Sequence, residues 1–250
     1  MKQMLSSALI AGLVAGLLCA LLQYLLVEPD ILLAERYETG ELTHVPAAAV
    51  PGDGQIHTHS AATATEEPAT QAATGAAASD GEGGSPVSRL ALTVLFTVLT
   101  YSGYGLILMG GIRLTESAGL TIGPSQALLW GLAGFMAFQM MPAIGLAPEL
   151  PGTPAADLQA RQIWWFATVV STGIGLWLIA YGRAMWQHVV GAGLLAAPHV
   201  AGAPQTDGFG GVVPPELAAS FAAHSLGLGL IIWVVLAWVL VTLWHHDPAP

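Results

Sequence analysis

The sequence has few charged residues. Only 9% of its 250 residues are Asp, Glu, Lys or Arg, against about 25% in ordinary globular domains. Sixteen acidic and six basic residues give a net charge of −10, and we expect no nucleic-acid partner for a chain this acidic. There is one cysteine, Cys19, so an intrachain disulfide is excluded.

Motifs of soluble enzymes are missing as well. The chain contains no GxxxxGK[ST], HExxH, GxSxG or CxxC pattern, so nucleotide hydrolysis, zinc-protease and serine-hydrolase chemistry have no support. No apolar run has an acid or a base in its middle, which argues against a proton pump built on buried carboxylates. We expect a protein that is not an enzyme and holds no tightly bound cofactor.

Long apolar runs fill most of the chain. Five of them have the ~20 residues that a helix needs to cross a bilayer. They span residues 5–27, 90–112, 127–147, 162–182 and 217–244. A sixth stretch, 185–200, is shorter and contains Pro198 near its end, so it is predicted as a short or re-entrant span. The prediction is an all-α integral membrane protein, a polytopic bundle of about six transmembrane helices.

The loop after the first span, 28–88, differs from the rest. Residues 46–86 consist mainly of Ala, Thr, Gly, Ser and Pro and cannot bury enough apolar area to fold, so we predict disorder there. The stretch 28–43 mixes apolar and charged residues, as in a short amphipathic helix at a membrane surface. Within the first span, small residues recur every four positions, which indicates a close helix contact inside the chain or with a partner. These are Ala8, Gly12, Gly16 and Ala20.

Six spans place both termini on one side of the membrane. Fourteen of the sixteen acids then fall on the side of the first loop. Because Lys2 precedes the first span, we expect cytoplasmic termini and an external first loop. An acidic outer face would attract cations, although acidic loops also serve simply to keep a surface solvated.

Polar residues near the outer ends of the spans are the candidate metal ligands. Imidazole and carboxylate groups suit divalent Co, Ni and Zn. The outer candidates are His199, His224, Glu216 and Glu149, with Gln139 as a deeper polar step and His188 on the inner side. The alternative for Gln139 and His224 is a structural hydrogen bond between helices. His57, His59, His245 and His246 are either metal scavengers or solvated tail residues.

Several runs resemble the CbtA family of probable cobalt transporter subunits. They are LWGLAGF (129–135), PAIGLAPELPG (142–152), ADLQARQIWW (156–165), PHVAGAP (198–204) and PEL (215–217). The resemblance covers nearly all of the chain except 46–86. It implies a subunit of cobalt uptake in the inner membrane, linked to cobalamin synthesis, with cobalt as substrate. It also implies a small one-span partner, CbtB, with a histidine-rich end.

Two functions remain after this reading. The first is a membrane permease subunit that takes up a divalent transition metal, cobalt before others. The second is a scaffold or accessory subunit that binds a partner helix and transports nothing itself, as the small-residue stripe suggests. A membrane enzyme would need a nucleophilic or charged cluster at the interface, and the sequence has none. Association into a homo-oligomer is left open.

Overall fold

The computed structural model describes residues 2–44, 86–206, 208 and 210–246, and all regular structure in these ranges is helical. This confirms the predicted all-α polytopic class. The segment predicted as disordered lies, except for its last residue, outside the described ranges. The helices are α1 (Lys2–Leu26), α2 (Glu28–Glu38), α3 (Pro86–Ser117), α4 (Pro124–Phe135), the π-helix η1 (Met136–Met140), α5 (Met141–Gly145), α6 (Leu158–Tyr181), α7 (Met185–Ala201) and α8 (Pro215–His246).

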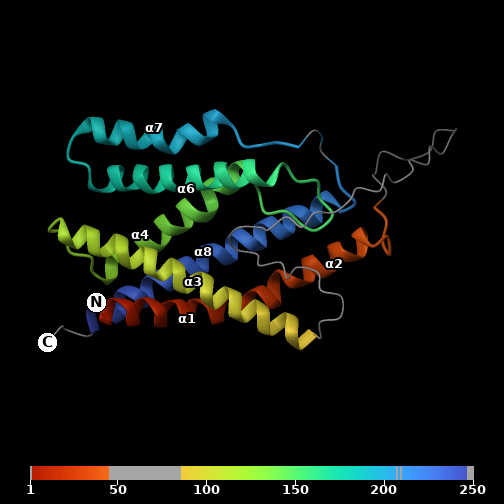
Figure 1. The fold of residues 1–250 in the computed structure, drawn as a ribbon, viewed down its shortest axis with the longest axis horizontal. Helices are drawn as coiled ribbons and strands as arrows, with labels where there is room; N and C mark the ends of the chain where they lie inside the picture. Colours follow the sequence, from red (N-terminus) through yellow and green to blue (C-terminus); the bar gives the residue numbers. More distant parts are fainter. Residues whose placement is uncertain (1, 45–85, 207, 209, 247–250) are drawn as a thin grey trace.

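Five helical segments of the described chain are long and apolar enough to cross a membrane. They are Lys2–Leu26, Val87–Ser117, Pro124–Gly145, Leu158–Tyr181 and Pro215–His245. The short stretch predicted between α6 and α8 forms one continuous helix, α7, of 17 residues. At 1.5 Å per residue α7 is about 25 Å long, somewhat less than the ~30 Å hydrocarbon core of a bilayer. It runs back along α6 over its whole length (Figure 1).

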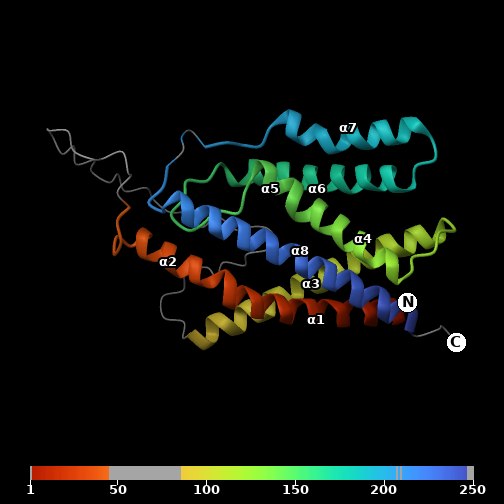
Figure 2. The same ribbon diagram turned by 180° about the vertical axis from the view of Figure 1, so that it is seen from behind.

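The start of α1 and the end of α8 lie at the same end of the bundle (Figures 1 and 2). The α3–α4 and α6–α7 connections are at this end, and the α5–α6 and α7–α8 connections are at the other. Between successive connections the chain therefore runs from one end of the bundle to the other. We refer to the two ends as the terminal end and the loop end.

The small residues of α1 pack against α3. A Cβ atom added at Gly16 would lie 2.5 Å from the Cα of Val98, and one added at Gly12 would overlap the backbone of Ser102. Neither contact leaves room for a side chain, so the two backbones approach closely. The helix contact that the stripe predicts is therefore made within this chain. Helix α8 packs against α1 on one side and against α4 on the other.

Helices α6 and α7 form a hairpin at one side of the bundle. Their closest approach is between two glycines, where a Cβ on Gly175 would lie 2.8 Å from the carbonyl oxygen of Gly191. The main contacts of α6 with the rest of the protein are to α4, η1 and α5. The segment from α4 to α5 thus joins the hairpin to the four-helix core of α1, α3, α4 and α8.

The third apolar run does not form a uniform helix. It begins as α4, passes through the π-helix η1 and ends as the short α5, which has Pro142 in its first turn. A π-helical turn inserts one extra residue into a helix and is frequently found at functional sites. In this protein the turn contains Gln139, one of the predicted site residues.

Candidate functional site

His224 on α8 is paired with Asp30 on α2. The two side chains approach to 2.8 Å between Nδ1 of His224 and Oδ2 of Asp30. Ser220, one turn earlier on α8, donates a longer hydrogen bond of 3.5 Å to the same carboxylate oxygen. The His224 side chain is 43% exposed and that of Asp30 is 14% exposed. When Nδ1 donates to the carboxylate, Nε2 is the nitrogen with the lone pair that a metal ion needs.

Glu216 is exposed near the first turn of α8, at the loop end. It precedes His224 by eight residues, which is about 12 Å along a helix. The two side chains share a face of α8 but are too far apart to hold one ion together. They can act only in sequence, as a carboxylate that a cation meets before it reaches the imidazole.

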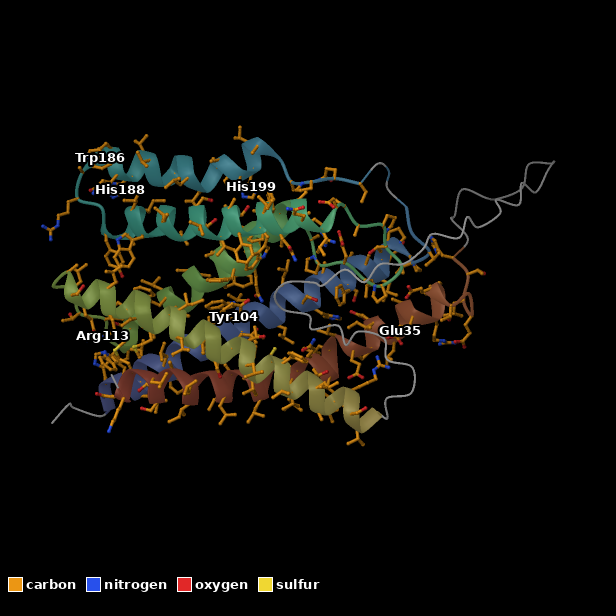
Figure 3. The ribbon with its side chains drawn as sticks, in the orientation of Figure 1. Glu35, Tyr104, Arg113, Trp186, His188 and His199 are labelled. Carbon is orange, nitrogen blue, oxygen red and sulfur yellow. The ribbon has the colours of Figure 1, made fainter. Side chains whose placement is uncertain are left out.

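His199 lies at the loop end of α7, as Figure 3 shows. Its ring meets the indole of Trp164 edge to face, with 6.0 Å between the ring centroids. Its Nε2 atom is buried without a hydrogen-bond partner, while Trp164 donates from Nε1 to the carbonyl oxygen of Pro198 at 3.2 Å. His199 therefore belongs to the α6–α7 hairpin, whereas His224 belongs to the contact between α2 and α8.

These outer residues do not form a single metal centre. Among the described residues no group of three or more His, Cys, Asp or Glu side chains is placed to hold a metal ion.

Glu149 is bound to Arg161 at 2.9 Å. Burial raises the pKa of the Glu149 carboxyl above its ordinary value, and the nearby guanidinium of Arg161 opposes that shift. The negative charge of Glu149 is thus largely balanced by Arg161.

Gln139 and His188 occupy very different environments. Gln139 is 8% exposed, and its Oε1 atom is buried without a hydrogen-bond partner. Its carboxamide lies against the backbone of Gly229, where an added Cβ would overlap it. His188 is near the terminal end of α7 (Figure 3) and contacts the carbonyl oxygen of Ala184 through Nδ1 at 3.1 Å. Gln139 is therefore part of the core, and His188 is part of the first turn of its own helix.

Comparison with known proteins adds a family assignment to this geometry. A family model described as "Probable cobalt transporter subunit (CbtA)" matches residues 1–245, nearly the whole chain. The chain belongs to the CbtA family. No curated protein and no solved structure matches it. Membership in CbtA makes this multi-pass membrane protein one of a family of probable cobalt transporter subunits, and the word subunit implies a partner.

Two parts of this CbtA structure were not anticipated from the sequence. Asp30 was not among the candidate residues. Its position just after the first span is the signal that could have indicated it. Cys19 and Tyr101 were also missed, and Tyr101 lies near both Cys19 and Gln139 in the core. Both are polar residues within apolar helices, and intramembrane polar groups are often functional.

Proposed function

We propose that the protein is the membrane permease subunit for uptake of a divalent transition metal, with cobalt destined for cobalamin synthesis as its substrate. The observation that carries this proposal is the His224–Asp30 pair. A histidine held through Nδ1 by a carboxylate is the usual arrangement of a metal-binding imidazole. Neutral imidazole is a good ligand for Co, Ni and Zn and a poor one for Mg and Ca.

The charge distribution supports cation entry at the loop end. Eight acidic residues of the described chain belong to this end: Glu28, Asp30, Glu35, Glu38, Glu41, Glu149, Asp157 and Glu216. Three arginines accompany them, and each is paired with one of these acids, Arg36 with Glu41, Arg89 with Glu35 and Arg161 with Glu149. The surplus negative charge raises the local concentration of divalent cations, within the range that salt screening allows.

In this proposal the loop end faces outward from the inner membrane, and both termini are cytoplasmic. A cation meets Glu216 and the other acids first and then exchanges water for His224. His199 and Glu149 guide cations on the hairpin side, Gln139 is a deeper step, and His188 is a step near the inner surface. The partner is a small one-span subunit with a histidine-rich end, like CbtB, and self-association is left open.

The alternative function is a scaffold that binds a partner helix and transports nothing. The small-residue stripe of α1 no longer favours it, because that stripe is filled by α3. The outer face of α7 is the surface that a partner helix would use, since Trp186, Val189 and Val200 are all exposed there. A scaffold needs no metal ligand. Loss of the His224 imidazole should therefore lower cobalt uptake if the chain is a permease and leave uptake unchanged if it is a scaffold.

The test is cobalt accumulation by intact cells that express the chain together with its partner. His224→Gln keeps the polarity and approximate size of the side chain but removes the imidazole. We expect accumulation to fall about tenfold or more at limiting cobalt, as loss of a metal contact does, with unchanged amounts of protein in the membrane. Equal accumulation by His224→Gln and the parent protein would contradict the proposal.

A further inference from the structure

A cluster of buried polar side chains lies between the core helices. Cys19 comes from α1, Tyr101 from α3 and Gln139 from η1, and they are 5%, 1% and 8% exposed. The Tyr101 hydroxyl lies within electrostatic reach of the Cys19 thiol and the Gln139 carboxamide. Even so, neither this hydroxyl nor Oε1 of Gln139 has a partner in hydrogen-bonding geometry.

Unpaired polar atoms are unfavourable in any protein interior, and they are more so at membrane depth, where water is scarce. Cys19 lies seven residues before the end of α1, about 10 Å along the helix. Gln139 lies six residues before the end of α5, about 9 Å along its segment. Both are thus well inside their spans. A buried group left unsatisfied in this way points to a ligand that completes its bonding.

Local backbone features position Gln139 in this cluster. The π-helical turn places Gln139 in the core, and Gly229 on α8 has no side chain where the carboxamide lies. On the other side is a block of aromatic rings formed by Tyr104, Phe138 and Trp233, whose centroids are 4.9–5.2 Å apart. Figure 3 shows Tyr104 in the middle of the bundle. The cluster is therefore enclosed and bordered by close-packed rings.

The three side chains share one chemical property. A thiol sulfur, a phenol oxygen and an amide oxygen all offer lone pairs, and the thiol becomes a strong metal ligand once it loses its proton. Thiolate favours transition metals such as Co, Ni and Zn over Mg and Ca, which prefer oxygen donors alone. The donor set therefore matches the same class of cation as His224.

We propose that Cys19, Tyr101 and Gln139 form a second coordination site for a divalent transition metal, inside the membrane. The metal binds the Cys19 sulfur in place of the thiol proton, which passes to a water molecule that the cation sheds from its hydration shell, and the two oxygens supply further bonds. As a step in transport this site rests on the proposed function, but as a binding site it does not. It is separate from His224, because Gly229 is five residues further along α8 and about 140° around the helix at 100° per residue.

Cobalt absorption spectroscopy tests the site directly. Co²⁺ bound to a thiolate has a sulfur-to-cobalt charge-transfer band in the near ultraviolet, and Co²⁺ bound only to nitrogen or oxygen does not. Because Cys19 is the only cysteine of the chain, this band reports on it alone. We expect cobalt chloride to produce the band in the purified full-length protein and not in Cys19→Ala. Cobalt binding by the parent protein without this band would overturn the proposal.

Two glycines of α8 give a matched pair of variants that leaves Cys19 in place. An added Cβ at Gly229 overlaps the Gln139 carboxamide, whereas one at Gly227 meets nothing within 4 Å. We expect Gly229→Ala to weaken the cobalt titration of the band by about tenfold and Gly227→Ala to leave it unchanged. Gel filtration is the control that checks that both variants remain folded. Identical titrations of the two variants would count against the involvement of Gln139.

Uptake measurements separate this inference from the proposed function. We expect Cys19→Ala to lower cobalt uptake at least fivefold at limiting cobalt. If the parent protein transports cobalt and Cys19→Ala transports it equally well, the membrane site is not on the route, and the permease function stands. If the parent shows the charge-transfer band but no uptake, the site stands and the permease function fails.

Discussion

At the scale of single residues, the orientation of His224 is the feature on which the proposed metal recognition depends. Asp30 accepts a hydrogen bond from Nδ1–H and so fixes both the ring position and the tautomer that leaves Nε2 free. A carboxylate beside the ring also makes the imidazole a more basic ligand. Ser220 contacts the same carboxylate oxygen, but at 3.5 Å its hydrogen bond is weak.

Asp30→Asn tests this arrangement, because it keeps the shape of the side chain and removes its charge. Loss of a carboxylate that orients a metal-binding histidine typically weakens metal affinity by 10- to 100-fold. We expect the cobalt concentration for half-maximal uptake to rise by about tenfold in Asp30→Asn. Ser220→Ala is the control and is expected to change it less than about twofold. A normal value in Asp30→Asn would show that His224 needs no orienting partner.

The sequence predicted His224 but not Asp30, for a physical reason. His224 was proposed as a site residue from its depth in a long apolar helix, which is a local property, and this remains a prediction. Asp30 is 194 residues away in the chain, and nothing local indicates which of many acidic residues will meet the imidazole. The same is true of Cys19 and Tyr101, which become neighbours of Gln139 only through helix packing.

At the scale of helices, the contact between α1 and α3 holds the core together. It depends on glycine at positions where a methyl group would overlap the backbone of the facing helix. In a membrane, where apolar burial gives little preference for one helix over another, close backbone packing is a main source of helix association.

Gly16→Ala is predicted to destabilise this contact. An added Cβ would lie 2.5 Å from the Cα of Val98, and such overpacking typically costs about 1–3 kcal/mol. Gly110→Ala on α3 is the matched control, since its Cβ meets nothing within 4 Å. In a helix that replacement is favourable by up to ~1 kcal/mol. Thermal unfolding of the purified proteins in detergent should show a lower Tm for Gly16→Ala only. If Gly16→Ala had the same Tm as Gly110→Ala, the added methyl group would not destabilise the contact between α1 and α3.

The helices themselves follow from the apolar runs, because length and hydrophobicity decide whether a segment can cross a bilayer. The helical class could be derived in this way, and the close helix contact of α1 could be derived from the spacing of its small residues. The π-helical turn at Met136–Met140 could not. Pro142 follows it and cannot donate a helical hydrogen bond, but a proline does not specify which irregularity forms. Around the turn, Gly134 lies against the Trp233 ring and Gln139 fits against Gly229. Such packing has no signature within the local sequence.

At the scale of the whole molecule, the start of α1 and the end of α8 lie together (Figures 1 and 2). Of the nine acidic residues in the described ranges, all but Glu116 belong to the opposite end. This arrangement requires α7 to traverse the bundle alongside α6. If the membrane covers the full bundle, the connections before and after α7 lie on opposite sides of it.

Cysteine labelling checks this topology in a Cys19→Ala background. Thr206→Cys is at the loop end and Arg183→Cys is at the terminal end. We expect an impermeant maleimide to label Thr206→Cys in intact cells and Arg183→Cys only after permeabilisation. Labelling of both from outside would mean that α7 enters and leaves the membrane on the same side.

The most direct measurement of the permease function is cobalt influx into proteoliposomes of defined composition. Vesicles would contain the partner alone, the chain with the partner, or the His224→Gln chain with the partner. The account predicts rapid influx only when the parent chain is present, and an influx about tenfold lower with His224→Gln at limiting cobalt. Equal influx with the partner alone and with the complete complex would contradict it, and would leave the chain as a scaffold.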